Sequence, residues 1–88
     1  MAQAPAELLT KVKRIIIDRL FLEVSAEALK DDESLTQAYG VDSVRLFDMV
    51  VGLEEDFGIS FADEELVLEN FDTAKAVAER VQSKLESK

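Results

Sequence analysis

Apolar side chains recur at intervals of three and four residues in three separate segments of this 88-residue chain, and nowhere do apolar and polar residues alternate as in a half-buried strand. This spacing predicts amphipathic helices at about 5–20, 43–57 and 72–86, each burying one face. A brief helix is expected at about 62–67. The pattern therefore predicts an all-α fold of three longer helices and one short helix, in a single domain spanning 1–88.

The ends of these helices can also be predicted. The segment 21–41 has no sustained period, so we expect a long loop between the first two long helices, with one short helical turn after Ser34. Asp42 or Ser43 can cap the start of the second long helix, and Asp72 is the expected N-cap of the last.

The acidic excess of the chain is confined to one third of its length. The chain has 19 acidic and 10 basic residues, a net charge of −9, and the segment from Asp42 to Asp72 holds ten of the acids but only one base, Arg45. Phosphate backbones are bound by clustered Lys and Arg, so this composition argues against a nucleic-acid partner. We expect this third of the chain to bind a basic partner instead.

The composition also excludes several kinds of chemistry. The chain has no histidine and no cysteine, which excludes disulfides, zinc sites built from Cys or His, and catalysis by a cysteine nucleophile or a histidine base. Carboxylates are abundant, but runs such as 54–56 are expected to be solvated rather than held in an apolar cleft, so we predict no enzymatic activity. The runs 31–33 and 63–65 lack the alternating acids of a calcium loop, so no metal site is expected.

The sequence also bears on location. The longest stretch without a polar side chain, Met49 to Leu53, is far shorter than the roughly 20 residues that span a bilayer. The residues from Met1 to Thr10 do not resemble a signal peptide. We therefore expect no membrane span and a cytoplasmic location.

Ser43 lies where a loop becomes the second long helix. A serine in this position commonly acts only as a helix cap. Its hydroxyl can instead be an attachment point, because free N–H groups and the positive end of the helix dipole favour a phosphate-bearing group at a helix start. The residues alone leave both interpretations open.

Two further features of this helix are ambiguous in the same way. The acids at 54–56 occupy its last turn, where the dipole makes each unfavourable by roughly 0.3–1 kcal/mol, so they form either a solvated end or a surface kept acidic for a basic partner. The charge segregation favours the second interpretation. Val44, Phe47 and Val51 lie beside the core stripe and either widen the buried face or form an exposed apolar strip suited to a transient contact.

Two motifs of this helix, Asp42-Ser43-Val44 and Leu53-Glu54-Glu55-Asp56-Phe57-Gly58-Ile59, resemble those of the acyl carrier proteins of fatty acid and polyketide synthesis. The likeness covers nearly the whole chain. It implies a four-helix bundle, acyl-carrier-like and without catalysis of its own. A phosphopantetheinyl transferase would attach 4'-phosphopantetheine from coenzyme A to Ser43. The terminal thiol, the only thiol of this cysteine-free protein, would then carry acyl groups as thioesters.

The resemblance also implies where partners dock. Acyltransferases, ketosynthases or acyl-ACP ligases would bring basic docking patches to the second long helix. Asp42 would belong to the recognition motif, and the other contacts implied are the acids Asp48, Glu54 and Glu55 and the apolar residues Val44, Phe47 and Val51.

Three positions depart from the family pattern. Val44 replaces the commoner Leu, Phe47 is bulkier than usual, and Arg45 falls where many fatty-acid carriers have an acid. Because like charges disfavour an interface, Arg45 should weaken contact with a basic partner. These departures indicate a specialised pathway.

Two alternatives share many of these features. A peptidyl or aminoacyl carrier has the same fold and serine, although its second helix is usually less acidic. An acidic helical interaction module, or a calcium-responsive one, would use Ser43 only as a cap. For the carrier we expect a monomer.

Overall fold

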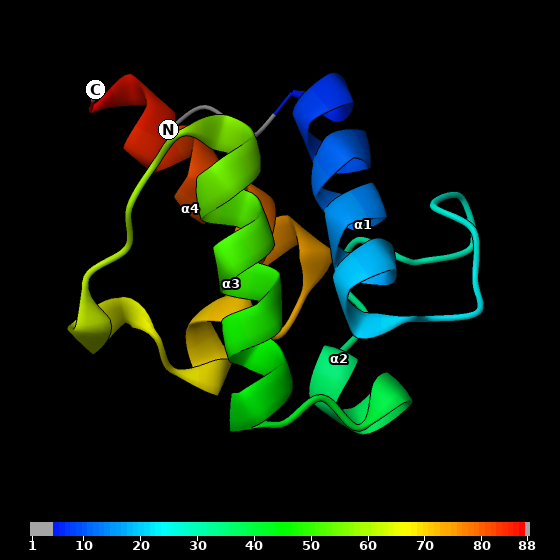
Figure 1. The fold of residues 1–88 in the computed structure, drawn as a ribbon. Helices are drawn as coiled ribbons and strands as arrows, with labels where there is room; N and C mark the ends of the chain where they lie inside the picture. Colours follow the sequence, from blue (N-terminus) through cyan, green and yellow to red (C-terminus); the bar gives the residue numbers. More distant parts are fainter. Residues whose placement is uncertain (1–4, 88) are drawn as a thin grey trace.

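The computed structural model describes residues 5–87 and consists of four α-helices and two short 3-10 helices, with no strand among these residues (Figure 1). This confirms the predicted all-α fold. α1 and α3 lie side by side, and α4 packs against both. The elements in chain order are α1 (Ala6–Leu20), α2 (Leu35–Tyr39), α3 (Ser43–Phe57), η1 (Asp63–Glu65), η2 (Leu68–Phe71) and α4 (Ala74–Glu86).

Most predicted helix bounds agree with the structure, but the segment expected to form a brief helix at 62–67 does not form an α-helix. It contains the single 3-10 turn η1, and the 3-10 helix η2 follows it. The Glu65 carboxylate accepts the amide of Ala62 at 2.8 Å and closes this turn locally. Because α-helix nucleation is costly, so short a segment gains little from continuing as an α-helix. The short α-helix is instead α2, the turn expected after Ser34.

The predicted N-cap of the last helix is wrong by one residue. Thr73 caps α4, and its Oγ1 accepts the amide of Ala76 at 3.0 Å. The carboxylate of Asp72 turns the other way, toward α2, where it accepts the Thr36 amide at 3.0 Å and the Ser34 hydroxyl at 2.8 Å. Asp72 therefore stabilises the start of α2, a helix 36 residues earlier in the chain.

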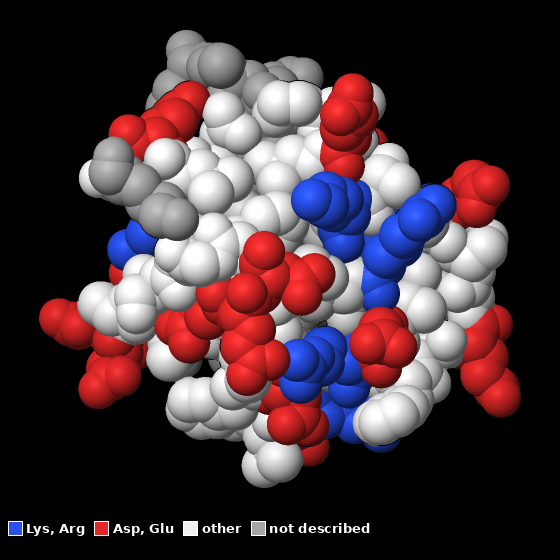
Figure 2. Space-filling model, turned by 45° about the horizontal axis from the view of Figure 1, so that its top comes forward, with Lys and Arg blue, Asp and Glu red and all other residues white. Residues whose placement is uncertain are grey.

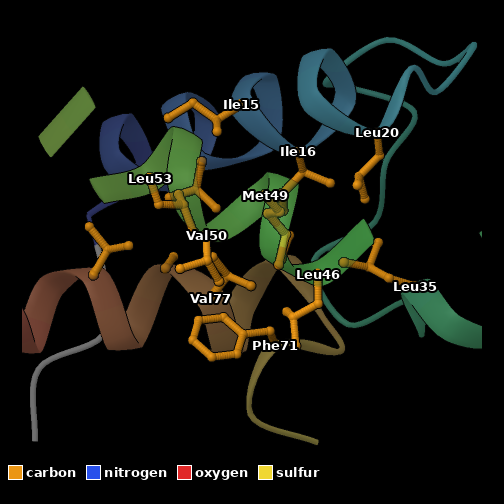
Figure 3. Packing of buried hydrophobic residues seen from close by; sticks show 14 of the residues in the cluster. Ile15, Ile16, Leu20, Leu35, Leu46, Met49, Val50, Leu53, Phe71 and Val77 are labelled. Atoms are coloured by element: carbon orange, nitrogen blue, oxygen red, sulfur yellow. The ribbon is translucent and has the colours of Figure 1, made fainter. Parts of the chain in front are cut away.

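The core is built from the apolar faces of the three long helices, and the side chain of Phe71 from η2 packs against α3 and α4 at one side of it (Figure 3). Phe71 is 2% exposed, and its ring meets that of Phe61 edge to face, with centroids 5.3 Å apart. Such packing holds the irregular segment between α3 and α4 against the bundle. The core residues labelled in Figure 3 from the long helices are Ile15, Ile16, Leu20, Leu46, Met49, Val50, Leu53 and Val77.

α1 ends in an unusual way. Phe21 is the C-cap, with φ 56° and ψ 42°, and its amide donates to the carbonyl of Ile17. Among the described residues it is the one non-glycine with positive φ. Glycine usually takes this position, because the left-handed conformation costs other residues roughly 1–2 kcal/mol. The ring recovers nothing by burial, since Phe21 is 85% exposed.

Candidate functional site

The start of α3 is capped by Asp42, which leaves Ser43 free. The Asp42 Oδ1 accepts the amide of Arg45 at 3.0 Å, and its carbonyl accepts that of Leu46 at 2.9 Å. Ser43 is the first residue of the helix and is exposed. Its hydroxyl has no hydrogen-bond partner within residues 5–87. Of the two candidate caps, the structure therefore selects Asp42, and the Ser43 hydroxyl does not cap the helix.

The surroundings of Ser43 suit a covalently attached phosphate group. The amides of Ser43 and Val44 lie in the first turn of α3, where a helix supplies no carbonyl partner of its own. The positive end of the dipole of this 15-residue helix lies at the same point, and the first turn contains no acid. An exposed hydroxyl, free amide donors and a favourable dipole therefore coincide at Ser43, directly after the carboxylate of Asp42.

The residues left ambiguous on α3 prove to be exposed. Val44 is 73% exposed, Phe47 55% and Val51 42%. We call these three residues the apolar strip. Asp48, which is also exposed, lies among them on the same face of the helix. The strip does not widen the core but presents apolar surface to solvent.

Two of the three acids at the end of α3, Glu54 and Glu55, are already engaged within the chain. Glu55 forms an ion pair with Arg19 at 2.9 Å. Glu54 is half-buried, and its Oε2 accepts the amide of Phe61 at 2.9 Å, which ties the loop after α3 to the helix. Figure 2 shows acidic side chains gathered at the centre of one face with basic side chains beside them. Part of the acidity predicted for partner contact therefore also serves the fold.

Arg45 does not stand as a free charge beside Ser43. Its Nη1 donates to the carbonyl of Leu20 at 3.2 Å, at the C-terminal end of α1. The negative end of the α1 dipole favours a cation there. Arg45 therefore links the head of α3 to the end of α1, a role that the sequence did not predict.

The sequence analysis also did not predict that Arg19 and Gly52 contact each other beside the site. The side chain of Arg19 crosses α3 at Gly52, where an added Cβ would lie 2.7 Å from its Nε. This close approach lets Arg19 reach Glu55. An isolated glycine inside a predicted helix was the available signal, because it is unfavourable there without a packing reason.

Few of the acids in 42–72 have a basic partner. Of the acids in 42–72, only Glu55 and Glu65 form ion pairs within residues 5–87, and Glu65 does so with Lys84 at 2.7 Å and Arg80 at 3.5 Å. Two basic residues of α1 are used elsewhere, since Lys13 pairs with Asp31 and Lys11 lies over the ring of Phe57. Repulsion among the remaining acids is therefore only weakly compensated.

This imbalance predicts salt-dependent stability. Raising sodium chloride from about 10 to about 150 mM shortens the screening length from about 30 to about 8 Å and should raise the melting temperature by a few degrees. Thermal unfolding followed by circular dichroism measures this. The double variant Asp63→Asn/Glu64→Gln should show a smaller rise. An equal melting temperature at both concentrations would show that the acids do not destabilise the fold.

Comparison with known proteins identifies the family. A family model described as the phosphopantetheine attachment site matches residues 11–81. The acyl carrier protein of Petrotoga mobilis is 40% identical over 60 residues, 68% of this chain and 68% of that protein. The chain belongs to the acyl carrier protein family. The acyl carrier protein of Nitratidesulfovibrio vulgaris strain DP4 is likewise 40% identical over 55 residues, 62% of this chain and 70% of that one.

A solved structure supports the same assignment. The acyl carrier protein from Enterococcus faecalis superposes with a TM-score of 0.70 at 27% identity, over 89% of this chain and 94% of that chain. Acyl carrier proteins bear a covalently attached 4'-phosphopantetheine, which the match to the attachment-site model assigns to this protein as well. They are carriers without catalysis of their own. No helix in residues 5–87 is long and apolar enough to cross a membrane.

Proposed function

We propose that Ser43 carries the 4'-phosphopantetheine and that the chain transports acyl intermediates for fatty acid, polyketide or specialised lipid synthesis. The observation that supports this is the exposed, unpartnered hydroxyl at the first residue of α3, beside a cap supplied by Asp42. When attached, the group supplies a thiol that holds the acyl chain as a thioester. The relatives named as acyl carrier proteins favour acyl over aminoacyl cargo.

The chain's own part in this function is to present Ser43 and to be recognised. Asp42 holds the first turn of α3 in place, so the hydroxyl is offered on a rigid helix end. A phosphopantetheinyl transferase and then acyltransferases, ketosynthases or acyl-ACP ligases would act on it, with this protein as their substrate.

We propose that these partners contact an apolar centre bordered by charge. The apolar strip supplies the centre, and beside it lie Asp42 and Asp48, which form no ion pair with any of residues 5–87. Glu54 and Glu55 contribute more weakly, because a basic partner has to compete with the Phe61 amide and with Arg19. Arg45, held against α1, adds local positive charge that disfavours a basic group at this point. Arg45 and the bulky Phe47 together support the proposal that the protein serves a specialised pathway.

The test is the mass of the intact protein after incubation with coenzyme A and a broad-specificity phosphopantetheinyl transferase. Wild-type protein should gain the mass of one phosphopantetheine group. Ser43→Ala should gain none, because the accepting oxygen is removed while the Asp42 cap remains.

Ser60→Ala is the matched control. Ser60 is also an exposed serine without a hydrogen-bond partner within residues 5–87, but it lies in the loop after α3. This variant should be modified as fully as wild type. A mass gain that persists in Ser43→Ala, or is lost in Ser60→Ala, would place the attachment elsewhere. No gain on folded wild-type protein would favour a non-carrier interaction module.

A further inference from the structure

Phe21 is not accounted for by the fold. It is 85% exposed, and it takes a left-handed conformation that glycine adopts freely. Neither burial nor backbone geometry therefore favours a phenylalanine at this position. An exposed aromatic side chain at the start of the loop that follows α1 suits contact with another molecule, because aromatic residues are enriched in protein interfaces.

The ring is continuous with the face of α3 that carries the apolar strip. Phe21 and Asp48 line the same surface hollow, together with Asp18 and Arg19. Asp48 is one helical turn after Val44 and next to Phe47. The contact from Arg45 to the Leu20 carbonyl fixes the end of α1, and with it Phe21, beside the head of α3. Phe21 therefore extends the apolar strip across to α1.

The charges around Phe21 define what could cover it. Asp18 and Asp48 are both exposed and have no ion pair within the described residues, whereas the one cation of the hollow, Arg19, is held by Glu55. The complement of this surface is an apolar pocket bordered by Lys or Arg. An apolar pocket with basic residues at its edge is a feature of a protein surface, so we expect the partner to be a protein.

The position of Ser43 indicates which kind of partner would cover Phe21. An enzyme that modifies Ser43 must reach its Oγ, and a specific protein interface covers about 800 Å² on each side. The end of α1 is one arginine side chain away from the first turn of α3. An interface of ordinary size centred near Ser43 therefore covers Phe21 as well.

We propose that Phe21 is a docking anchor for the phosphopantetheinyl transferase that modifies Ser43, entering an apolar pocket bordered by Lys or Arg. This inference rests on the proposed attachment at Ser43. It adds Phe21 and Asp18, both on or beside α1, to a recognition surface otherwise confined to α3.

The anchor is tested by measuring the steady-state kinetics of phosphopantetheine transfer. The reaction contains coenzyme A and a purified broad-specificity transferase, and the concentration of the unmodified protein is varied. Phe21→Gly should raise the KM for the protein by about tenfold or more, the scale of a lost interface anchor, with kcat within about twofold of wild type. Glycine keeps the left-handed cap, so the melting temperature should not fall. Asp18→Asn should raise the KM by a smaller factor and reduce its dependence on salt.

Val67→Ala is the matched control. Val67 is another exposed apolar residue, 41% exposed, but it lies beside η2 rather than on the docking surface. Its KM should equal that of wild type. An unchanged KM for Phe21→Gly, a fall in kcat alone, or an equal rise for Val67→Ala would overturn the anchor. If wild-type protein gains no mass at all, the attachment at Ser43 fails instead, so the two failures are distinguishable.

Discussion

Phe71→Ala is expected to lower the free energy of unfolding by about 3–5 kcal/mol, the range observed when a buried aromatic side chain is removed. Phe71 is 2% exposed and packs edge to face on Phe61. It is also the point where η2 joins α3 and α4. Domains of this size have total stabilities of only about 5–15 kcal/mol, so the loss should leave the protein close to its unfolding threshold. Urea unfolding followed by circular dichroism measures it.

Phe47→Ala is the control for this prediction. The same chemical change is made in α3 at a residue that is 55% exposed. Its effect on stability should stay within about 0.5 kcal/mol. Equal losses in the two variants would mean that the contacts of Phe71 do not determine the stability of the bundle.

Asp72→Ala is expected to lower the free energy of unfolding by about 1–3 kcal/mol, because it leaves the Thr36 amide and the Ser34 hydroxyl without their acceptor. Both donors are partly buried. The effect should appear first in α2, the element directly before the loop that leads to Ser43. Hydrogen exchange at the amides of α2, together with urea unfolding, measures it.

This loss should depend on pH. Partial burial raises the pKa of Asp72, but hydrogen bonds from the Thr36 amide and the Ser34 hydroxyl outweigh burial and hold the pKa below its usual value of 3.8. A carboxylate with a lowered pKa stabilises the fold above its unfolded pKa and loses that effect as the pH falls through the folded one. The difference between wild type and Asp72→Ala should therefore be full at pH 7 and shrink below about pH 3.8.

Two controls separate the hydrogen bonds from the charge. Asp72→Asn keeps one acceptor oxygen and should cost less than Asp72→Ala. Glu69→Gln removes an exposed charge from the neighbouring 3-10 helix and should change stability little. If Glu69→Gln destabilises as much as Asp72→Ala, the effect is one of net charge and the proposed cap on α2 is wrong.

The features of the fold that depend on local sequence could be predicted. The apolar stripe of α3 repeats at helical spacing and predicts the helix; it consists of Leu46, Met49, Val50 and Leu53. The cap candidates at 42 and 43 predict where this helix begins. Ser43 could be located for the same reason, since the start of a helix is a local property. The resemblance to acyl carrier proteins added the chemistry of the attached group.

The features of the fold that depend on residues distant in the sequence could not be predicted. Asp72 was read as the cap of the helix that follows it, but its partners at 34 and 36 become neighbours only in the folded chain. The same holds for Arg19 across Gly52 and for Arg45 at the end of α1. Each of these side chains could have paired with several groups of similar chemistry. The packing of the helices determines which of those groups lies within reach.

The separation of the cap from the hydroxyl has a consequence for the proposed attachment at Ser43. Because Asp42 rather than Ser43 caps the first turn of α3, a substituent on the Ser43 oxygen breaks no hydrogen bond within residues 5–87. The unmodified and modified proteins can therefore share one backbone. A partner enzyme can distinguish them by what projects from the surface, without any refolding of the carrier at each turn of the cycle.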